Sequence, residues 1–183
     1  WALGNHDYDN INLVKHFTKR NNFYSYSKNK ITFLVLDTQD SLSNFIGEQM
    51  NLIKKVTDTI SESTHLILLM HKLVWIYGNP ELSDYESDAN AGIGNSFSAI
   101  NPNNFYTDVY PLLLDVLNRD IEVICVSGDL GKNTKKLSYV TEQGIYFLAC
   151  GLNDNDEEDV VLIFDHDIDK KMLTWQFYKL NSL

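Results

Sequence analysis

The sequence predicts a mixed α/β fold in which two packed β-sheets are flanked by helices. Strand-like apolar runs alternate with segments of helical spacing up to about residue 129, and four strand-like segments joined by short polar turns follow. The first pattern is typical of parallel β/α units and the second of a β meander. No internal repeat or linker divides the chain, so we expect residues 1–183 to form a single domain.

The amino-terminal third is expected to supply one helix, a strand pair and a second helix. Residues 1–10 are interpreted as the end of a strand that enters a loop, and 11–20 have mixed helical spacing. Residues 22–38 predict two strands around a Lys-Asn-Lys turn. Apolar residues recur every three or four positions over 45–61, which predicts a helix packed on one face.

The central region predicts two buried strands separated by a long connection and a helix. The runs at 64–71 and 121–129 are continuously apolar, as expected of strands buried on both faces. Residues 72–104 are polar and lack periodicity, and we expect 79–104 to form a lid. The helix predicted over 105–119 contains a proline, which it accommodates if Pro111 lies in the first turn.

The last third predicts four strands, at 135–141, 144–150, 158–167 and 171–180. His166 is placed in an exposed hairpin turn between the last two strands. His16 and His65 have no partner pattern around them, which favours surface or structural roles.

Composition restricts the classes of partner. The chain carries 25 acidic and 15 basic residues, a net charge of −10, which argues against a surface that binds nucleic acid. No apolar stretch reaches the roughly 18–20 residues of a membrane span. Cys125 and Cys150 each end an apolar run, and free buried thiols on neighbouring strands are favoured over a disulfide. The cellular compartment and the oligomeric state stay open.

Polar residues suited to a metal or a phosphate follow three apolar runs. They are Gly-Asn-His-Asp at 4–7, His71, and Ser-Gly-Asp at 127–129. Because ligands of open α/β sheets gather at the carboxyl ends of strands, these three segments are expected to meet in one cleft. Amide oxygen, imidazole nitrogen and carboxylate are suitable ligands for Mn, Fe or Zn.

The order of these motifs resembles the calcineurin-like metallophosphoesterases. The matching segments are GNHD, FLVLDT, GEQMNLIKKV leading to HLILLMHK, and VICVSGD. The resemblance implies a pair of β-sheets flanked by helices, with two divalent metal ions (Mn, Fe or Zn) at the sheet edge. It implies hydrolysis of a phosphate mono- or diester by a metal-activated water, and it weakens after about residue 135.

Transferred residue by residue, the resemblance implies roles for six positions. Asn5 and His71 would be metal ligands, and Asp129 would take the place of the first histidine of the family's Gly-His-x-His element. His6 would contact the phosphate and protonate the leaving group, and Asp7 would orient the His6 ring. Lys72 could bind the substrate phosphate, with a solvent-facing lysine as the alternative.

Two departures from the family pattern lower the expected activity. The family's Asp-x-His and Gly-Asp-x-x-Asp elements do not occur here and would precede residue 1, so we expect an amino-terminally incomplete domain that lacks its first strands. Gly131 replaces the second histidine of Gly-His-x-His and cannot bind a metal. These 183 residues alone are therefore expected to be weakly active or inactive.

Other interpretations stay open at this point. The Gly-Asn-His-Asp motif and Asp129 are compatible with simple turns, and His71 is compatible with a structural role at a strand end. The alternative function is a catalytically degenerate domain that keeps the fold and acts as a binding or scaffolding module.

Overall fold

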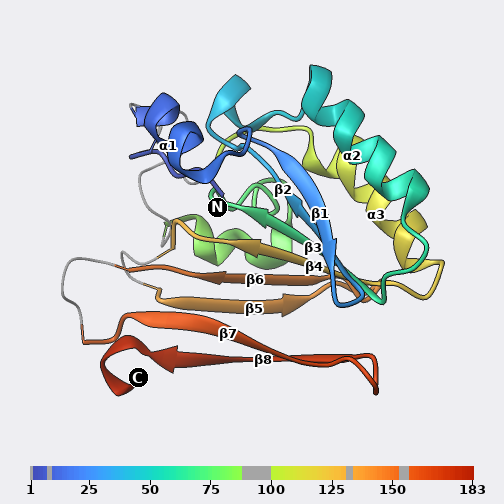
Figure 1. Cartoon of the computed structure of the whole chain (residues 1–183). Helices are drawn as coiled ribbons and strands as arrows, with labels where there is room; N and C mark the ends of the chain where they lie inside the picture. Colours follow the sequence, from blue (N-terminus) through green and yellow to red (C-terminus); the bar gives the residue numbers. More distant parts are fainter. Residues whose placement is uncertain (1, 8–9, 88–99, 131–133, 153–156) are drawn as a thin grey trace.

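A computed structural model describes residues 2–7, 10–87, 100–130, 134–152 and 157–183. Its centre is a six-stranded mixed sheet with the strand order β1-β2-β3-β4-β6-β5, and a separate antiparallel pair is formed by β7 and β8 (Figure 1). Strands β2, β3, β4 and β6 run parallel, and β1 and β5 are antiparallel to their neighbours. The predicted mixed α/β class is confirmed in this form.

The first half of the chain follows the predicted elements closely. The helices are α1 (Ile11–Thr18) and α2 (Gly47–Thr59), and the strands are β1 (Tyr24–Lys28), β2 (Ile31–Val35) and β3 (His65–Met70). The expected strand at 1–10 is wrong, because the described part of this segment is a turn closed by a hydrogen bond from Asp7 N to Gly4 O. The Lys-Asn-Lys turn is confirmed, and Asn29 and Lys30 have the positive φ angles of a tight hairpin turn.

Two further elements precede the fourth strand of the central sheet. A π-helical turn (Phe105–Val109), closed by the hydrogen bond from Tyr110 N to Phe105 O, leads into α3 (Tyr110–Leu117). Pro111 lies in the first turn of α3, as predicted, where its missing N–H leaves no helical hydrogen bond unmade. Strand β4 (Glu122–Ser127) follows.

The carboxyl-terminal strands are present but do not form one meander. Their bounds are β5 (Lys136–Val140), β6 (Tyr146–Cys150), β7 (Val160–Asp167) and β8 (Met172–Lys179). β5 and β6 join the central sheet, with β6 parallel to β4, so only β7 and β8 belong to the second sheet. The exposed-turn interpretation of His166 is wrong, because this residue lies within β7 and is partly buried.

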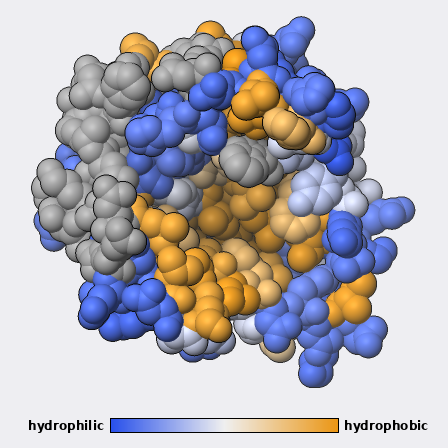
Figure 2. Space-filling view, turned by 60° about the vertical axis from the view of Figure 1, so that its left-hand side comes forward, coloured by the Kyte–Doolittle hydropathy of each residue, from blue (hydrophilic) through white to orange (hydrophobic). Residues whose placement is uncertain are grey.

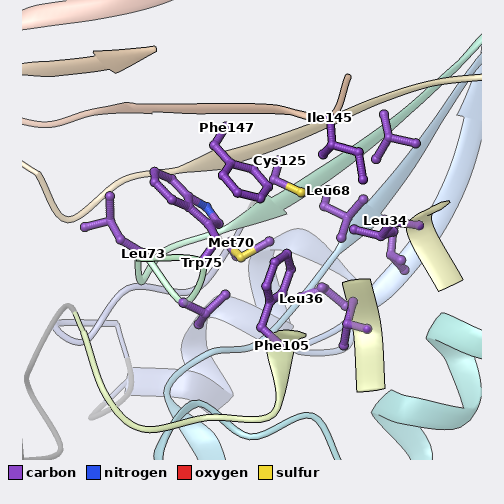
Figure 3. Packing of buried hydrophobic residues seen from close by; sticks show 14 of the residues in the cluster. Leu34, Leu36, Leu68, Met70, Leu73, Trp75, Phe105, Cys125, Ile145 and Phe147 are labelled. Carbon is purple, nitrogen blue, oxygen red and sulfur yellow. The ribbon is translucent and has the colours of Figure 1, made fainter. Parts of the chain in front are cut away.

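One face of the central sheet is covered by α2 and α3 (Figure 1). Alternate residues of the strands, among them Leu34, Leu68 and Cys125, pack there against the helices. The ring of Trp75 stacks on Phe147 with 5.0 Å between centroids (Figure 3). Burial of this continuous apolar layer holds the carboxyl ends of the strands in place.

The opposite face packs partly against the β7–β8 hairpin. Ile31, Ile67, Ile124 and Leu148 of the central sheet and Leu173 of the hairpin form this second cluster. Other apolar residues beside it stay half-buried: Phe33, Leu69 and Val126. Figure 2 shows a hollow with an apolar floor and a hydrophilic rim on the side of the molecule that carries α1 in Figure 1.

Two further expectations concern thiols and membranes. Cys125 on β4 and Cys150 on β6 are free cysteines on paired strands, as predicted. Within the described ranges, every helix is too short or too polar to cross a bilayer.

Candidate functional site

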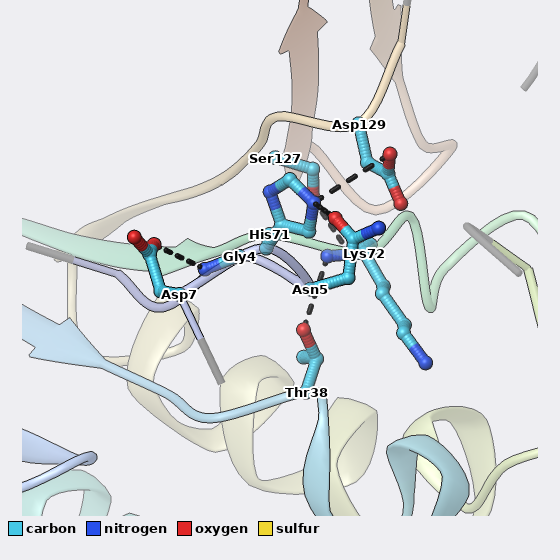
Figure 4. Close-up of polar contacts among 8 residues, drawn as sticks. All are labelled: Gly4, Asn5, Asp7, Thr38, His71, Lys72, Ser127 and Asp129. Carbon is cyan, nitrogen blue, oxygen red and sulfur yellow. Dashed lines mark hydrogen bonds and ion pairs between the residues drawn. The ribbon is translucent and has the colours of Figure 1, made fainter. Parts of the chain in front are cut away.

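The three polar segments predicted to meet do so at the carboxyl end of the parallel strands (Figure 4). His71 directly follows β3, and Asp129 lies two residues beyond β4. The turn at 4–7 brings Asn5 to the same place, where its Oδ1 lies 3.0 Å from Nε2 of His71. The same nitrogen is 3.5 Å from Oδ1 of Asp129. Asn5 and Asp129 therefore both lie close to Nε2 of His71, and the three predicted metal ligands meet at one place.

Two glycines leave room for the His71 ring. A Cβ added at Gly4 would lie 3.2 Å from Cε1 of His71, and one at Gly128 would lie 3.3 Å from its Nδ1. Both contacts are tighter than ordinary van der Waals distances, so a side chain at either position would displace the ring. The lack of a side chain at Gly4 of GNHD and Gly128 of SGD thus gives the His71 ring the space that it occupies.

Asp129 combines burial with an uncommon backbone conformation. It is 8% exposed and has a φ angle of 49°, in the left-handed region that aspartate tolerates better than most residues. The turn interpretation and the ligand interpretation of Asp129 are therefore compatible. The left-handed turn is what aims the carboxylate towards His71.

The turn at 4–7 is closed by one hydrogen bond within the backbone and one from the backbone to a side chain. Asp7 N donates to Gly4 O at 3.1 Å, and Gly4 N donates to Oδ2 of Asp7 at 3.0 Å. The carboxylate of Asp7 thus stabilises the turn that carries Asn5. His6 is exposed, as a group that meets a substrate from solution must be. The predicted contact between Asp7 and the His6 ring stays a prediction.

Lys72 lies beneath the site and has no exposed surface. The alternative of a solvent-facing lysine is therefore wrong. Burial lowers the pKa of Lys72, and the nearby carboxylates of Asp129 and Asp37 oppose that shift. The predicted role of Lys72 in substrate binding stays a prediction.

Three residues hold the segment after β3: Thr38 and Trp75, which the sequence did not single out, and Ser127 of the predicted Ser-Gly-Asp segment. Lys72 N donates to Oγ1 of Thr38 at 3.0 Å, and Oγ of Ser127 donates to the carbonyl of Lys72 at 3.0 Å. Trp75 Nε1 donates to the same Ser127 oxygen at 3.1 Å. Thr38 follows an apolar run and Ser127 ends one. A polar residue at the end of a strand-like run is the sequence signal that could have identified Thr38.

Gln49 fixes the end of β2 in a similar way. Its Oε1 accepts from Asp37 N at 2.7 Å, and its Nε2 donates to Asp37 O at 3.0 Å. Gln49 is buried on α2, so this pair of hydrogen bonds ties the helix to the strand end next to Thr38. In the sequence, Gln49 could have been recognised only as a polar residue on the apolar side of the predicted helix.

The donor set fits part of the coordination shell of one divalent ion. Because an amide oxygen only accepts, Nε2 of His71 is the donor to Asn5, and a metal bound to both atoms would replace that hydrogen. Two oxygens and one imidazole nitrogen suit Mn, Fe or Zn. No group of three or more His, Cys, Asp or Glu that could hold a metal occurs among the residues described.

Two predicted features fall at least partly outside the described residues. The proposed lid at 79–104 includes 88–99, and Gly131 belongs to the segment 131–133. Of the lid, the structure describes a 3-10 helical segment, Pro80–Ser87, and residues 100–104.

Comparison with known proteins identifies no family. No protein-family model matches the chain, and no curated protein matches it. The resemblance to metallophosphoesterases therefore depends on the motifs and their order alone.

Proposed function

We propose that this chain provides part of a metal-dependent site for the hydrolysis of a phosphate mono- or diester. The observation that supports it most is the convergence of Asn5, His71 and Asp129 from three separate segments on one nitrogen atom.

The metal and the protein would have different tasks. A bound divalent ion would neutralise phosphate oxygens and lower the pKa of a water molecule. Asn5, His71 and Asp129 would hold one such ion, and Gly4 and Gly128 would fix the orientation of the His71 ring. Exposed His6 would donate a proton to the departing oxygen, a contribution of roughly 10²–10⁴-fold in rate.

Lys72 would add a positive charge below the site. The pKa of this buried lysine is lowered by desolvation, but Asp129 and Asp37 favour its charged form. Its ammonium would offset the negative charge of Asp129 when no metal is bound. It would also keep the segment that carries His71 packed against the sheet.

The proposal is tested by metal content and turnover measured on the same preparation. The chain is purified with Mn²⁺ and without chelator, and bound metal is counted by elemental mass spectrometry. Hydrolysis of p-nitrophenyl phosphate and of bis(p-nitrophenyl) phosphate follows. We expect bound metal and slow, Mn²⁺-dependent turnover that His6→Gln lowers by about 100-fold or more. His16→Gln, on the exposed side of α1, is the matched control and should change nothing.

The alternative is a binding module that has lost its chemistry. The hydrogen bond between Asn5 and His71 favours it, because this contact already satisfies both atoms without a metal. Absence of bound metal would contradict the proposed metal site and support the binding module. Turnover that is equal in His6→Gln and the parent chain would contradict the role given to His6.

A further inference from the structure

A second histidine cluster lies at the other end of β3 from the candidate site. His65 is the first residue of β3, and its side chain is 1% exposed. Its ring meets that of His166 on β7 edge-on, with 5.7 Å between centroids and 83° between planes. Its Nε2 lies 3.3 Å from Oε2 of Glu122 on β4. The two imidazoles therefore connect the central sheet to the β7–β8 hairpin.

Both ring nitrogens of His65 face polar groups. Nδ1 shares a hydrogen bond of 2.8 Å with the hydroxyl of Thr64, which also lies 3.2 Å from the carbonyl of Lys30. Nε2 faces the carboxylate of Glu122. It is buried and makes no hydrogen bond, and the same holds for Nε2 of His166. Two buried imidazole nitrogens without hydrogen-bond partners thus lie in one interface.

The pair has both apolar and polar neighbours, the polar ones of His65 being Thr64 and Glu122. On the neighbouring strands, Ile31 of β2 pairs with His65, and Leu173 of β8 pairs with His166. Asp165 and Asp167 flank His166 on the strand, where side chains alternate between faces, and Asp167 pairs with Lys170 at 2.8 Å. Among the described residues, the groups that act electrostatically on His65 are Glu122, which favours its charged form, and His166, which opposes it.

We propose that His65 and His166 form a pH-dependent latch that holds the β7–β8 hairpin against the central sheet and loosens on acidification. At neutral pH the His65 ring is uncharged, and the two rings continue the apolar interface formed by Ile67, Ile124 and Leu173. In acid, a charge on His65 would be buried and would face a second imidazole across the interface. Opening of the hairpin brings both rings to water. The latch does not depend on the proposed hydrolysis, because His65 begins β3 and His71 follows its opposite end.

The direction of the pH effect follows from the environment of His65. Burial lowers the pKa of His65 from 6.5, and the attraction of Glu122 only partly opposes this shift. The closed state therefore binds protons less readily than the open state. The latch is fully closed above about pH 6.5 and weakens as the pH falls below that value.

Hydrogen exchange of the hairpin at pH 7.5 and pH 5.5, corrected for intrinsic rates, tests the latch. Because the pKa of His65 is lower in the closed state than in the open state, the opening constant rises as the pH falls below 6.5. We expect such a rise for residues 160–179 in the parent chain. It should be absent in His65→Phe, which fills the same space without titrating, and smaller in His166→Phe. His16→Gln, on exposed α1, should behave like the parent chain.

Two results would overturn the latch. One is equal protection of the hairpin at both pH values in the parent chain. The other is an unchanged pH dependence in His65→Phe. If His65→Phe does not fold, NMR titration of the parent chain replaces it. A midpoint of the His65 ring signals below 6.5, followed by the amide shifts of the hairpin, would support the latch. A midpoint at or above 6.5 would refute it.

Discussion

Gly128 lies so close to His71 that a Cβ at residue 128 would stand 3.3 Å from Nδ1 of the ring. Gly128→Ala should therefore move the ring by a few tenths of an ångström and misalign Nε2 with Asn5 and Asp129. Since the orientation of a histidine ligand commonly changes metal affinity by about 10–100-fold, we expect a loss of at least about tenfold in Mn²⁺ affinity. Titration calorimetry measures it.

The control for this substitution is Ser138→Ala on β5, which is exposed and outside the site. It should leave Mn²⁺ binding unchanged. Equal Mn²⁺ affinity in Gly128→Ala and the parent chain would show that the ring position does not govern the site.

Lys72→Met tests the buried charge below the site. Methionine keeps most of the side-chain volume but leaves the carboxylates of Asp129 and Asp37 without the lysine charge that acts on them. Removing one partner from buried charges commonly costs about 3 kcal/mol or more, so we expect a loss of this size in the free energy of unfolding. Urea unfolding followed by circular dichroism measures it.

Lys55→Met, on the exposed side of α2, is the matched control for Lys72→Met. Its free energy of unfolding should stay within about 0.5 kcal/mol of the parent value. A Lys72→Met chain as stable as the parent would mean that the charge of Lys72 contributes nothing to folding.

Gln49→Ala removes both hydrogen bonds between α2 and the end of β2. The N–H and carbonyl of Asp37 lose partners at 2.7 and 3.0 Å in a buried place. Each unsatisfied buried group costs about 1–3 kcal/mol, so a loss of about 2–4 kcal/mol in unfolding free energy is expected. Asn51→Ala, exposed on the same helix, should cost far less. A similar cost for both variants would refute the structural role of Gln49.

The two thiols should differ in alkylation rate. Burial raises the pKa of Cys125 well above its usual range, and burial also raises that of Cys150, which is partly exposed. A raised pKa leaves less thiolate at pH 8, and thiolate is the reactive form. Mass spectrometry after iodoacetamide treatment should find Cys150 modified first and Cys125 only on unfolding. Rapid modification of Cys125 in the folded chain would contradict its burial.

The helices and strands could largely be predicted from the sequence because their signals are local. Period and length identified α2 and β3, and the ends of β3 and β4 explain why His71 and Asp129 meet, whereas Asn5 reaches them from a turn. Membership of β5 and β6 in the central sheet was missed, because partner choice among strands depends on contacts distant in sequence.

The errors at Lys72 and His166 have physical causes. A lysine is normally exposed, and its burial here depends on Asp37 and Asp129, which are far away in the chain. The polar run around His166 was typical of a turn. Cross-strand pairing with Leu173 nevertheless extends β7 through Asp167.

The π-helical turn before α3 determines which side of that helix faces the sheet. The hydrogen bond from Tyr110 N to Phe105 O spans one residue more than a hydrogen bond of an α-helix does. Beyond this turn, Leu113 and Val116 of α3 are buried in the apolar layer. Deletion of a single residue here would rotate the two parts of the helix by about 100° relative to each other. Either Phe105 or the pair beyond Pro111 would then face water. The packing of Phe105, Leu113 and Val116 thus constrains the number of residues in this segment.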